Sequence, residues 1–425
     1  MSAFDKVIAY EDEKKELLCY SDMIKNYEKY EALGVSFPRG IMIFGEPGLG
    51  KTTLAKCFIE ECGCPSFIIR KDKPDGEFVD HIKEVFEKAK NEEKAIVLLD
   101  DIDKYANEDY KHCDAEEYVA VQACIDGCAD SRVFVIMTVN DSCFLPDSLK
   151  RSGRICRTLE IHSPNKEQRE EIIRYYLSTK KIDKDVDPKD VLRLINGGSC
   201  ADLEEIINDA GLLAGYKDRD RINRDDILQA CIRKRFQSSE FRRNTNPKML
   251  RRIAVHEAGH AIVAEVLDPG SVNMLSVYAG SEDGGGVTTV EWSSENKGSL
   301  EYFQNDIMCN LGGKAAIELV YGVADVGCRR DMSASYEILH RLVVACAFGF
   351  SAYEDNYGEY EKEEIHRTKA REMEKLYDRT RKLIADNRQL LDRMVEAICK
   401  NITLTYREIG KIKADLLAKD EDHLL

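Results

Sequence analysis

The sequence has no segment long enough to cross a bilayer as an apolar helix. Such a helix needs roughly 18 or more predominantly apolar residues, and the apolar run around residues 133–139 is only about as long as a strand. The N-terminal residues 1–4 lead directly into charged sequence, so no secretory signal peptide is expected. We therefore expect a cytoplasmic protein without a membrane segment, with membrane association only if an anchor has been removed.

The sequence also lacks an excess of basic residues. It contains 62 Lys and Arg against 78 Asp and Glu, and its formal net charge is -16. A surface this acidic repels the phosphates of nucleic acids and of anionic lipids, so no nucleic acid partner is expected. With 425 residues, of which 43% are hydrophobic and 33% charged, the chain is predicted to be globular with two or three domains.

The cysteine pattern is not that of a disulfide or zinc framework. There are 15 cysteines, an odd number, and no two of them form a C-x-x-C pair. Most lie within apolar stretches, which indicates reduced and largely buried thiols. A second metal site built from cysteines is therefore not expected.

A glycine-rich loop follows a short apolar run. Residues 40–44 predict a buried parallel strand, and a helix is expected to begin near Lys51. The loop fits the pattern G-x-x-x-x-G-K-[ST], in which backbone N–H groups surround phosphates, the lysine reaches the β- and γ-phosphates and the hydroxyl holds Mg²⁺. The candidate ATP and Mg²⁺ ligands are Gly45, Glu46, Pro47, Gly48, Leu49, Gly50, Lys51, Thr52 and Thr53.

Two further apolar runs end in polar side chains. Residues 95–99 precede Asp100 and Asp101, the form of a Walker B strand. Asp100 would hold Mg²⁺ through water, and Asp101 would act catalytically by orienting or deprotonating the attacking water. Residues 133–137 lead to Asn140, which could position the same water near the γ-phosphate. Together these motifs predict nucleotide hydrolysis.

Two arginines, Arg151 and Arg154, lie on a predicted loop after these motifs. Taken alone, they would be interpreted as solvated surface residues. Following three strand-end motifs, they are better interpreted as arginine fingers that reach the nucleotide of a neighbouring subunit.

A second motif predicts a metal centre. Residues 250–267 suit a helix that carries His256, Glu257 and His260 in the pattern H-E-x-x-H. Histidines four residues apart share one helix face and can bind one Zn²⁺, while Glu257 can serve as a general base. A third ligand is required. Spacing does not choose among the downstream candidates, which are Asp306, Glu318, Asp325 and Asp331.

The order of these motifs resembles the AAA+ ATPases and, more narrowly, the FtsH-type ATP-dependent zinc metalloproteases, over nearly the whole chain. The resemblance implies an α/β AAA+ module, with a parallel sheet flanked by helices and a helical lid, followed by a mainly α-helical zinc metallopeptidase domain. We expect the nucleotide-binding subdomain at residues 1–160, the lid at 161–238 and the peptidase at 239–425.

The same resemblance assigns further residues. Residues 310–316 and 327–332 are similar to the G-G-x-A-A and G-x-x-x-D-[LM] blocks of the family, which makes Asp331 the third zinc ligand. Residues 199–203 are similar to the start of the lid helix that closes over adenine, which brings in Ala201. The family forms ring hexamers, so Arg151 and Arg154 would act in trans. A predicted hairpin at residues 275–292 would present a strand edge to the substrate.

Three departures from the family concern the motor and the anchor. Family members usually carry transmembrane helices ahead of the ATPase, whereas this chain begins at the ATPase. Asp101 stands where the family has a glutamate. The family threads substrate with an aromatic–hydrophobic–glycine loop, but the matching residues 70–79 are short and charged, and Phe78-Val79 lacks the following glycine.

The sequence thus favours an ATP-dependent zinc metalloendopeptidase that degrades polypeptides in a homo-hexamer, with one Zn²⁺ per chain, ATP and Mg²⁺ as cofactors. Two alternatives stay open. One is a remodelling ATPase or assembly factor with a weak or vestigial peptidase. The other is a peptidase whose nucleotide only drives ring assembly.

Overall fold

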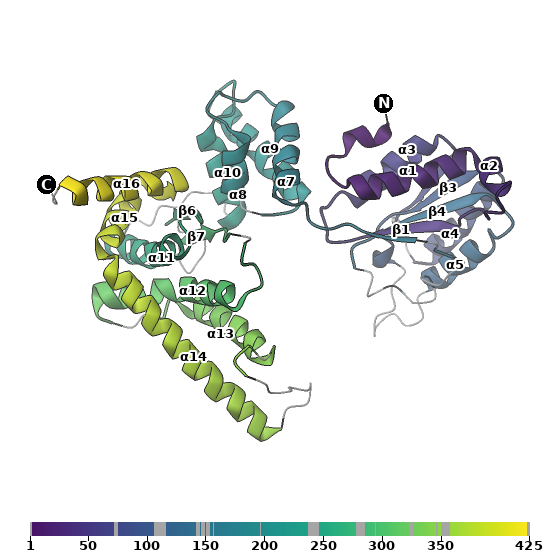
Figure 1. The fold of residues 1–425 in the computed structure, drawn as a ribbon. Helices are drawn as coiled ribbons and strands as arrows, with labels where there is room; N and C mark the ends of the chain where they lie inside the picture. Colours follow the sequence, from purple (N-terminus) through teal and green to yellow (C-terminus); the bar gives the residue numbers. More distant parts are fainter. Residues whose placement is uncertain are drawn as a thin grey trace. The chain divides into compact units, whose positions relative to one another are not determined.

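The computed structural model describes residues 2–71, 75–105, 116–141, 145, 149, 154–155, 157–195, 197–236, 246–277, 285–293, 295–323, 326–345, 347–349 and 358–422. The chain divides into two compact units (Figure 1). The first comprises Met1–Leu192 and Gly197–Asp226, and the second comprises Arg193–Asn196 and Ile227–Leu425. Within the described residues, no helix combines the length and the apolar character needed to cross a membrane.

The first unit contains a five-stranded sheet in which every neighbouring pair is parallel. The strands lie in the order β2 (Ser66–Ile69), β3 (Ala95–Leu99), β4 (Val133–Val139), β1 (Gly40–Phe44) and β5 (Arg157–Glu160). All residues of β3 and β4 are buried, as expected for apolar runs at the centre of a sheet covered on both faces. The predicted strands at residues 40–44 and 95–99 are confirmed, and the third strand continues two residues further than predicted, through Thr138 to Val139.

Side chains along each strand point alternately to the two faces of the sheet, so the core of this unit has two parts, one on each face. Val135 and Met137 of β4 join a cluster on one sheet face, while Phe134 and Ile136 join a cluster on the other. Helices cover both faces of the sheet (Figure 1). Helix α3 (Lys51–Cys62) packs on β1 and β4, and α4 (Asp75–Lys90) packs on β2 and β3. The other helical elements of this part of the chain are the 3₁₀ helix η1 (Ala3–Lys6), α1 (Glu11–Lys25), α2 (Tyr27–Glu31), the 3₁₀ helix η2 (Ile102–Lys104) and α5 (Glu116–Asp126).

Among the described residues, four helices follow the sheet before residue 237. They are α7 (Lys166–Ser178), α8 (Pro188–Ile195), α9 (Cys200–Tyr216) and α10 (Arg224–Phe236). Capping boxes fix the N-termini of α7 and α9. Asn165 and Gln168 exchange side-chain-to-backbone hydrogen bonds at the first, and Ser199 and Asp202 do so at the second. The cap at Ser199 fixes where α9 begins, and this beginning lies against the glycine loop described below.

The second unit is mainly helical. From residue 247 onward its elements are α11 (Pro247–Leu267), β6 (Val272–Ser276), β7 (Val287–Val290), α12 (Leu300–Tyr321), α13 (Arg329–Val344), α14 (Glu359–Asp386), α15 (Arg388–Asn401), β8 (Thr403–Thr405) and α16 (Tyr406–Asp422). The three strands form an antiparallel sheet in the order β7-β6-β8. The helix predicted over residues 250–267 is present, and strands β6 and β7 form the hairpin predicted at residues 275–292, with its first strand beginning earlier, at Val272.

Helices α11 and α12 cross where two glycines meet. A Cβ on Gly259 would lie 2.3 Å from the carbonyl oxygen of Gly312, and a Cβ on Gly312 would lie 2.5 Å from that of Gly259. Real Cβ atoms do not approach so closely, so both positions must be glycine for the backbones to touch. This crossing brings α12 against the helix face that carries the two histidines.

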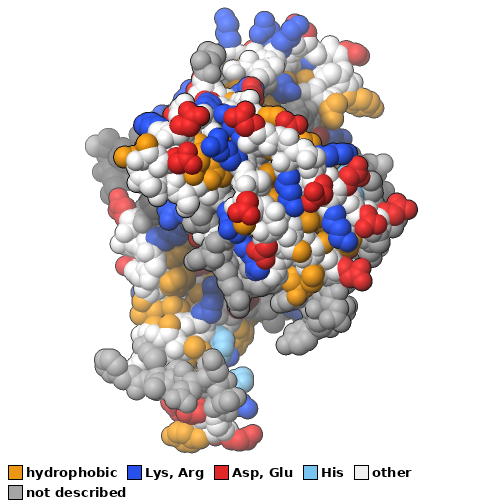
Figure 2. All heavy atoms as spheres, turned by 90° about the vertical axis from the view of Figure 1, so that its right-hand side faces the viewer, with side chains coloured by type: hydrophobic (Ala, Val, Ile, Leu, Met, Phe, Trp, Pro, Cys, Tyr) orange, Lys and Arg blue, Asp and Glu red, His pale blue; other side chains and the backbone are white. Residues whose placement is uncertain are grey.

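The face shown in Figure 2 carries acidic and basic side chains interspersed with apolar ones. Neither sign of charge forms a continuous patch over the part of this face that the structure describes.

Candidate functional site

The glycine loop connects β1 to α3 and has the backbone that its glycines permit. Gly45, Gly48 and Gly50 have φ angles of 149°, 79° and 88°. A Cβ on Gly45 would lie 2.2 Å from the oxygen of Ile161, and one on Gly48 would lie 2.5 Å from Oγ of Ser199. The loop ends at the N-terminus of α3, where free backbone N–H groups and the helix dipole favour phosphate. The loop residues therefore fit a nucleotide phosphate chain.

Lys51 is the first residue of α3 and is only 5% exposed. Its ammonium group donates hydrogen bonds of 2.8 Å to the carbonyl oxygens of Gly45 and Glu46. Burial lowers the pKa of Lys51, and the nearby charges of Asp101, Asp103 and Asp100 oppose that shift. The lysine thus lies over the loop that would hold the phosphates.

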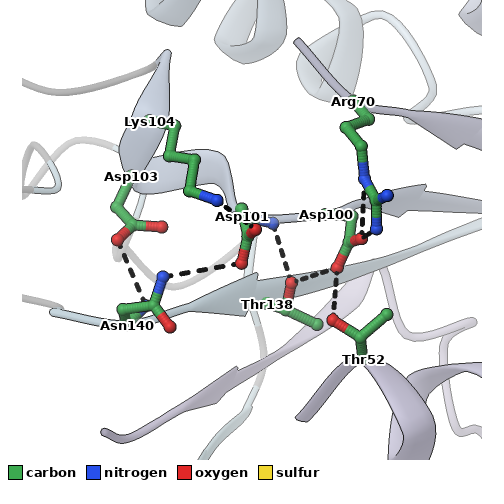
Figure 3. Close-up of polar contacts among 8 residues, drawn as sticks. All are labelled: Thr52, Arg70, Asp100, Asp101, Asp103, Lys104, Thr138 and Asn140. Atoms are coloured by element: carbon green, nitrogen blue, oxygen red, sulfur yellow. Dashed lines mark hydrogen bonds and ion pairs between the residues drawn. The ribbon is translucent and has the colours of Figure 1, made fainter. Parts of the chain in front are cut away.

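Asp100, which follows β3, is the centre of a polar cluster at the carboxyl edge of the sheet (Figure 3). Its Oδ1 accepts hydrogen bonds from Thr52 Oγ1 at 2.8 Å and from Thr138 Oγ1 at 2.7 Å. Its Oδ2 accepts from Arg70, with Nε at 3.1 Å. Burial opposes ionisation of Asp100, but these hydrogen bonds outweigh it and lower the pKa of the carboxyl. Sequence reasoning missed Arg70 and Thr138.

Asp101 has a left-handed backbone, with a φ of 53°. Its backbone N–H donates to Thr138 Oγ1 at 2.8 Å, and its carboxylate accepts from Lys104 Nζ at 2.6 Å. Asn140 Nδ2 lies 3.5 Å from the other carboxylate oxygen of Asp101 (Figure 3). The structure therefore brings together Asp101 and Asn140 as the sequence suggested, and it adds Lys104 as a cation beside Asp101.

The start of α9 lies against the glycine loop within the first unit. The backbone N–H of Ala201 donates to the carbonyl oxygen of Gly48 at 3.2 Å. Arg154 forms an ion pair with Asp126, with its closest N–O distance at 2.6 Å. The partner predicted beside it, Arg151, lies outside the described residues.

Phe78, the aromatic residue of the segment matched to a substrate-threading loop, lies in the core. Helix α4 begins at Asp75, and the Phe78 side chain is 0% exposed. Its ring contacts that of Tyr105 edge-on, with centroids 5.1 Å apart. It is therefore not available to grip a polypeptide. Residues 72–74 of the same segment lie outside the described residues.

The candidate metal ligands converge from two helices of the second unit. His256 and His260 come from α11, and Asp331 comes from α13. The two Nε2 atoms are 3.0 Å apart, and Oδ2 of Asp331 lies 3.2 Å from that of His256 and 3.7 Å from that of His260. Ligands bound at about 2.0–2.1 Å around a tetrahedral Zn²⁺ stand roughly 3.3 Å apart. The three residues therefore fit one zinc ion.

The surroundings orient these ligands. Nδ1 of His260 lies 2.7 Å from the carbonyl oxygen of Cys309. Because a carbonyl only accepts, Nδ1 carries the hydrogen and the lone pair of Nε2 faces the metal position. Gly313 leaves room for the rings, since a Cβ there would lie 2.5 Å from Cε1 of His256 and 2.7 Å from Nε2 of His260.

Glu257 belongs to α11, and its side chain contacts β7. Its Oε2 accepts from Thr288 Oγ1 at 2.7 Å, and a Cβ on Gly286 would lie 2.4 Å from its Cγ. Burial raises the pKa of Glu257 to about 7, while His260 and the Thr288 hydrogen bond act in the opposite direction. Sequence reasoning missed Thr288 and Gly286; the only signal was their place in a short glycine-containing hairpin downstream of the histidines.

Two of the other acids considered as third ligands have partners elsewhere. Asp306 accepts from Trp292 Nε1 at 3.3 Å. Glu318 is bound to Lys314 and to Tyr377. Asp325 lies outside the described residues. In the part of the chain that is described, only His256, His260 and Asp331 form a group of acids, histidines or cysteines that could hold a metal.

Comparison with known proteins gives matches for both regions. Residues 41–163 match the ATPase family associated with various cellular activities (AAA), and residues 243–370 match peptidase family M41. These ranges include the glycine loop and Asp100 in one case, and the His-His-Asp group in the other.

Similar proteins match almost the whole chain. Proteins named ATP-dependent zinc metalloprotease FtsH from Lactococcus lactis, Caldicellulosiruptor bescii and Bacillus subtilis are 29%, 28% and 26% identical to it. Each alignment covers 96% of this chain. The chain spans 63%, 71% and 69% of the length of these relatives, respectively.

Proposed function

Because the chain joins an AAA ATPase domain to a family M41 peptidase domain, we propose that it is an ATP-dependent zinc metalloendopeptidase that degrades polypeptides. We assign nucleotide binding to residues 1–160, the lid to 161–238 and the peptidase to 239–425. The observation that carries this proposal is the convergence of ligand atoms from His256, His260 and Asp331 within 4.8 Å of one another, beside Glu257.

The peptidase chemistry follows from the position of each group. Zinc would polarise the scissile carbonyl and lower the pKa of a water molecule to about 7. Glu257 is the general base, because it is adjacent in sequence to one ligand and its carboxylate is held by Thr288. Strand β7 is at the edge of its sheet, beside Glu257, and is the proposed site where an extended substrate pairs.

The nucleotide site is assigned in the same way. Gly45 to Thr53 surround the phosphates, with Lys51 on the β- and γ-phosphates and Thr52 and Asp100 on Mg²⁺. Asp101 and Asn140 orient the attacking water, supported by their contact at the carboxyl edge of the sheet. We assign Ala201 to the adenine, and the hydrogen bond between the start of α9 and the glycine loop supports this assignment.

We assign Arg151 and Arg154 to the nucleotide of a neighbouring subunit, in a homo-hexamer. Arg154 is in the first unit, and its guanidinium pairs with Asp126, whose side chain is 46% exposed. An arginine held by a partly exposed acid can exchange it for the phosphate of a neighbouring subunit, which supports the assignment in trans. We also propose a cytoplasmic location, which is supported by the free thiols of the described cysteines.

The intact His-His-Asp group argues against the alternative of a vestigial peptidase. The deciding experiment measures degradation of one unfolded and one folded reporter protein, with and without ATP, before and after zinc chelation. An ATP-dependent protease requires both zinc and ATP. Cleavage that ignores ATP once the ring has formed would favour the assembly-only alternative, and no cleavage by a zinc-loaded chain would favour the remodelling ATPase.

A further inference from the structure

An arginine just after β2, the strand next to β3, forms an ion pair with Asp100, the acid assigned to Mg²⁺. Arg70 directly follows β2, and its guanidinium reaches across to Asp100 at the end of β3 (Figure 3). Both Nε and a terminal nitrogen of Arg70 contact the same carboxylate oxygen, Oδ2. Because β2 and β3 are parallel neighbours, this contact is set by the sheet itself.

The oxygen that Arg70 contacts is the one that a magnesium shell needs. Oδ1 of Asp100 already accepts the hydroxyls of Thr52 and Thr138. The Thr52 hydroxyl gives its hydrogen to Asp100, so its lone pairs are left for a metal ion. Within the described residues, Oδ2 accepts only from Arg70, and it is therefore the carboxylate oxygen open to exchange.

The burial of the two partners shows which of them can move. The Asp100 side chain is 1% exposed and is fixed by two hydroxyls, whereas that of Arg70 is 59% exposed. A buried carboxylate is costly without a compensating cation. A long exposed side chain can leave it when another cation arrives, at the small free energy typical of a partly solvated ion pair.

We propose that Arg70 competes with Mg²⁺ for Asp100 and thereby sets the Mg²⁺ concentration at which the chain binds nucleotide. The Arg70 guanidinium and Mg²⁺ are both positively charged and would both bind Oδ2 of Asp100. Binding of one at this oxygen therefore disfavours binding of the other. This inference rests on the proposed nucleotide site and concerns its metal requirement.

The test is a titration of Mg²⁺ into the full chain at a fixed concentration of ADP. Nucleotide binding is followed by calorimetry, and the melting temperature is followed in parallel. Arg70→Gln keeps a long polar side chain but removes the charge. It should lower the midpoint Mg²⁺ concentration about threefold to tenfold, the effect of losing one competing ion pair, and should increase the rise in melting temperature caused by Mg²⁺.

Arg39→Gln is the matched control. Arg39 immediately precedes β1, at the amino ends of the parallel strands, whereas Arg70 lies at their carboxyl ends. It makes the same change in net charge and should leave the midpoint unchanged. Arg70→Lys keeps the charge but loses the two-nitrogen contact, and should give a smaller decrease. If Arg70→Gln does not fold, the Mg²⁺ midpoint of Arg70→Lys still tests the proposal.

A midpoint that is unchanged or raised in the Arg70 variants overturns the competition. An equal shift in Arg39→Gln also overturns it, since general charge would then be the cause. Absence of any Mg²⁺-dependent nucleotide binding by the wild type would overturn the proposed nucleotide site itself, and this inference with it.

Discussion

The hydroxyl oxygen of Thr288 lies 2.7 Å from Oε2 of Glu257 and 3.0 Å from the backbone oxygen of the same residue. One side chain of β7 therefore holds both the carboxylate and the backbone of the proposed general base. A hydrogen bond to a charged group contributes about 1.5–3 kcal/mol. The orientation of Glu257 thus depends on a residue that is not in the H-E-x-x-H motif.

We predict that Thr288→Val, which removes the hydroxyl and keeps the shape, lowers kcat for cleavage of a short peptide about 10- to 100-fold. KM and zinc content should change little, because the ligands are untouched. Thr288→Ser restores the hydroxyl and should recover most of kcat. Equal losses in both variants would indicate that Thr288 acts through packing alone.

Replacing the base itself gives the second prediction. Glu257→Gln should reduce peptide cleavage by about 10²-fold or more, the usual contribution of a general base, while zinc content and ATP hydrolysis stay at the wild-type level. The variant is nearly isosteric and can still accept the Thr288 hydrogen bond. Cleavage near the wild-type rate, measured with a fluorogenic peptide, would remove Glu257 from the mechanism.

The sequence predicted the strands of the nucleotide-binding unit more completely than the side-chain contacts of its site. Apolar runs ending in Asp100 and Asn140 were enough to place strands and to expect their tips at one edge, because parallel strands bring their carboxyl ends together. The contact between Arg70 and Asp100 was not predictable, whereas Lys104 lies only three residues after Asp101. Arg70 precedes Asp100 by 30 residues, and nothing in a local pattern says which neighbouring strand tip a long side chain reaches.

The zinc ligands show the same limit. The four-residue spacing of His256 and His260 depends only on helix geometry, so the sequence alone predicted that pair. The third ligand depends on how α13 packs near α11, and spacing left four acids open. Thr288 was missed for the same reason, and Gly313 was noted only as part of the block at residues 310–316, because their roles arise from tertiary contacts with Glu257 and His256.

The metal centre gives the third prediction. Asp331→Ala should lose or greatly weaken bound zinc, measured by elemental analysis after dialysis, because two histidines leave the ion short of its usual three protein ligands. Asp325→Ala is the comparison that the sequence suggests and should retain zinc. The opposite pattern, with zinc lost only from Asp325→Ala, would show that the third ligand has been misassigned.

Gly313 tests the space around the metal rather than a ligand. Gly313→Ala places a methyl group at 2.5 Å from Cε1 of His256, so we predict displaced rings and weaker zinc binding. Gly410→Ala is the matched control, because that helical position in α16 has no heavy atom within 4 Å of an added Cβ. Its zinc content and cleavage should be unchanged. Full zinc binding by Gly313→Ala would show that the helices adjust at this crossing.

The fifth prediction concerns the motor. Phe78 is buried against Tyr105, and the Asp101 carboxylate is paired with Lys104. The described part of the threading segment therefore lacks an aromatic side chain that could grip a substrate, and a cation lies beside the acid that should activate water.

We predict that the wild-type chain cleaves an unfolded reporter readily and a stably folded version of the same reporter poorly, in the presence of ATP. An aromatic–hydrophobic–glycine insertion at residues 72–74 should raise the rate on the folded reporter and leave the unfolded one unaffected, because only unfolding requires the grip. Equal wild-type rates on the two reporters would mean that the chain pulls on its substrates by some other surface.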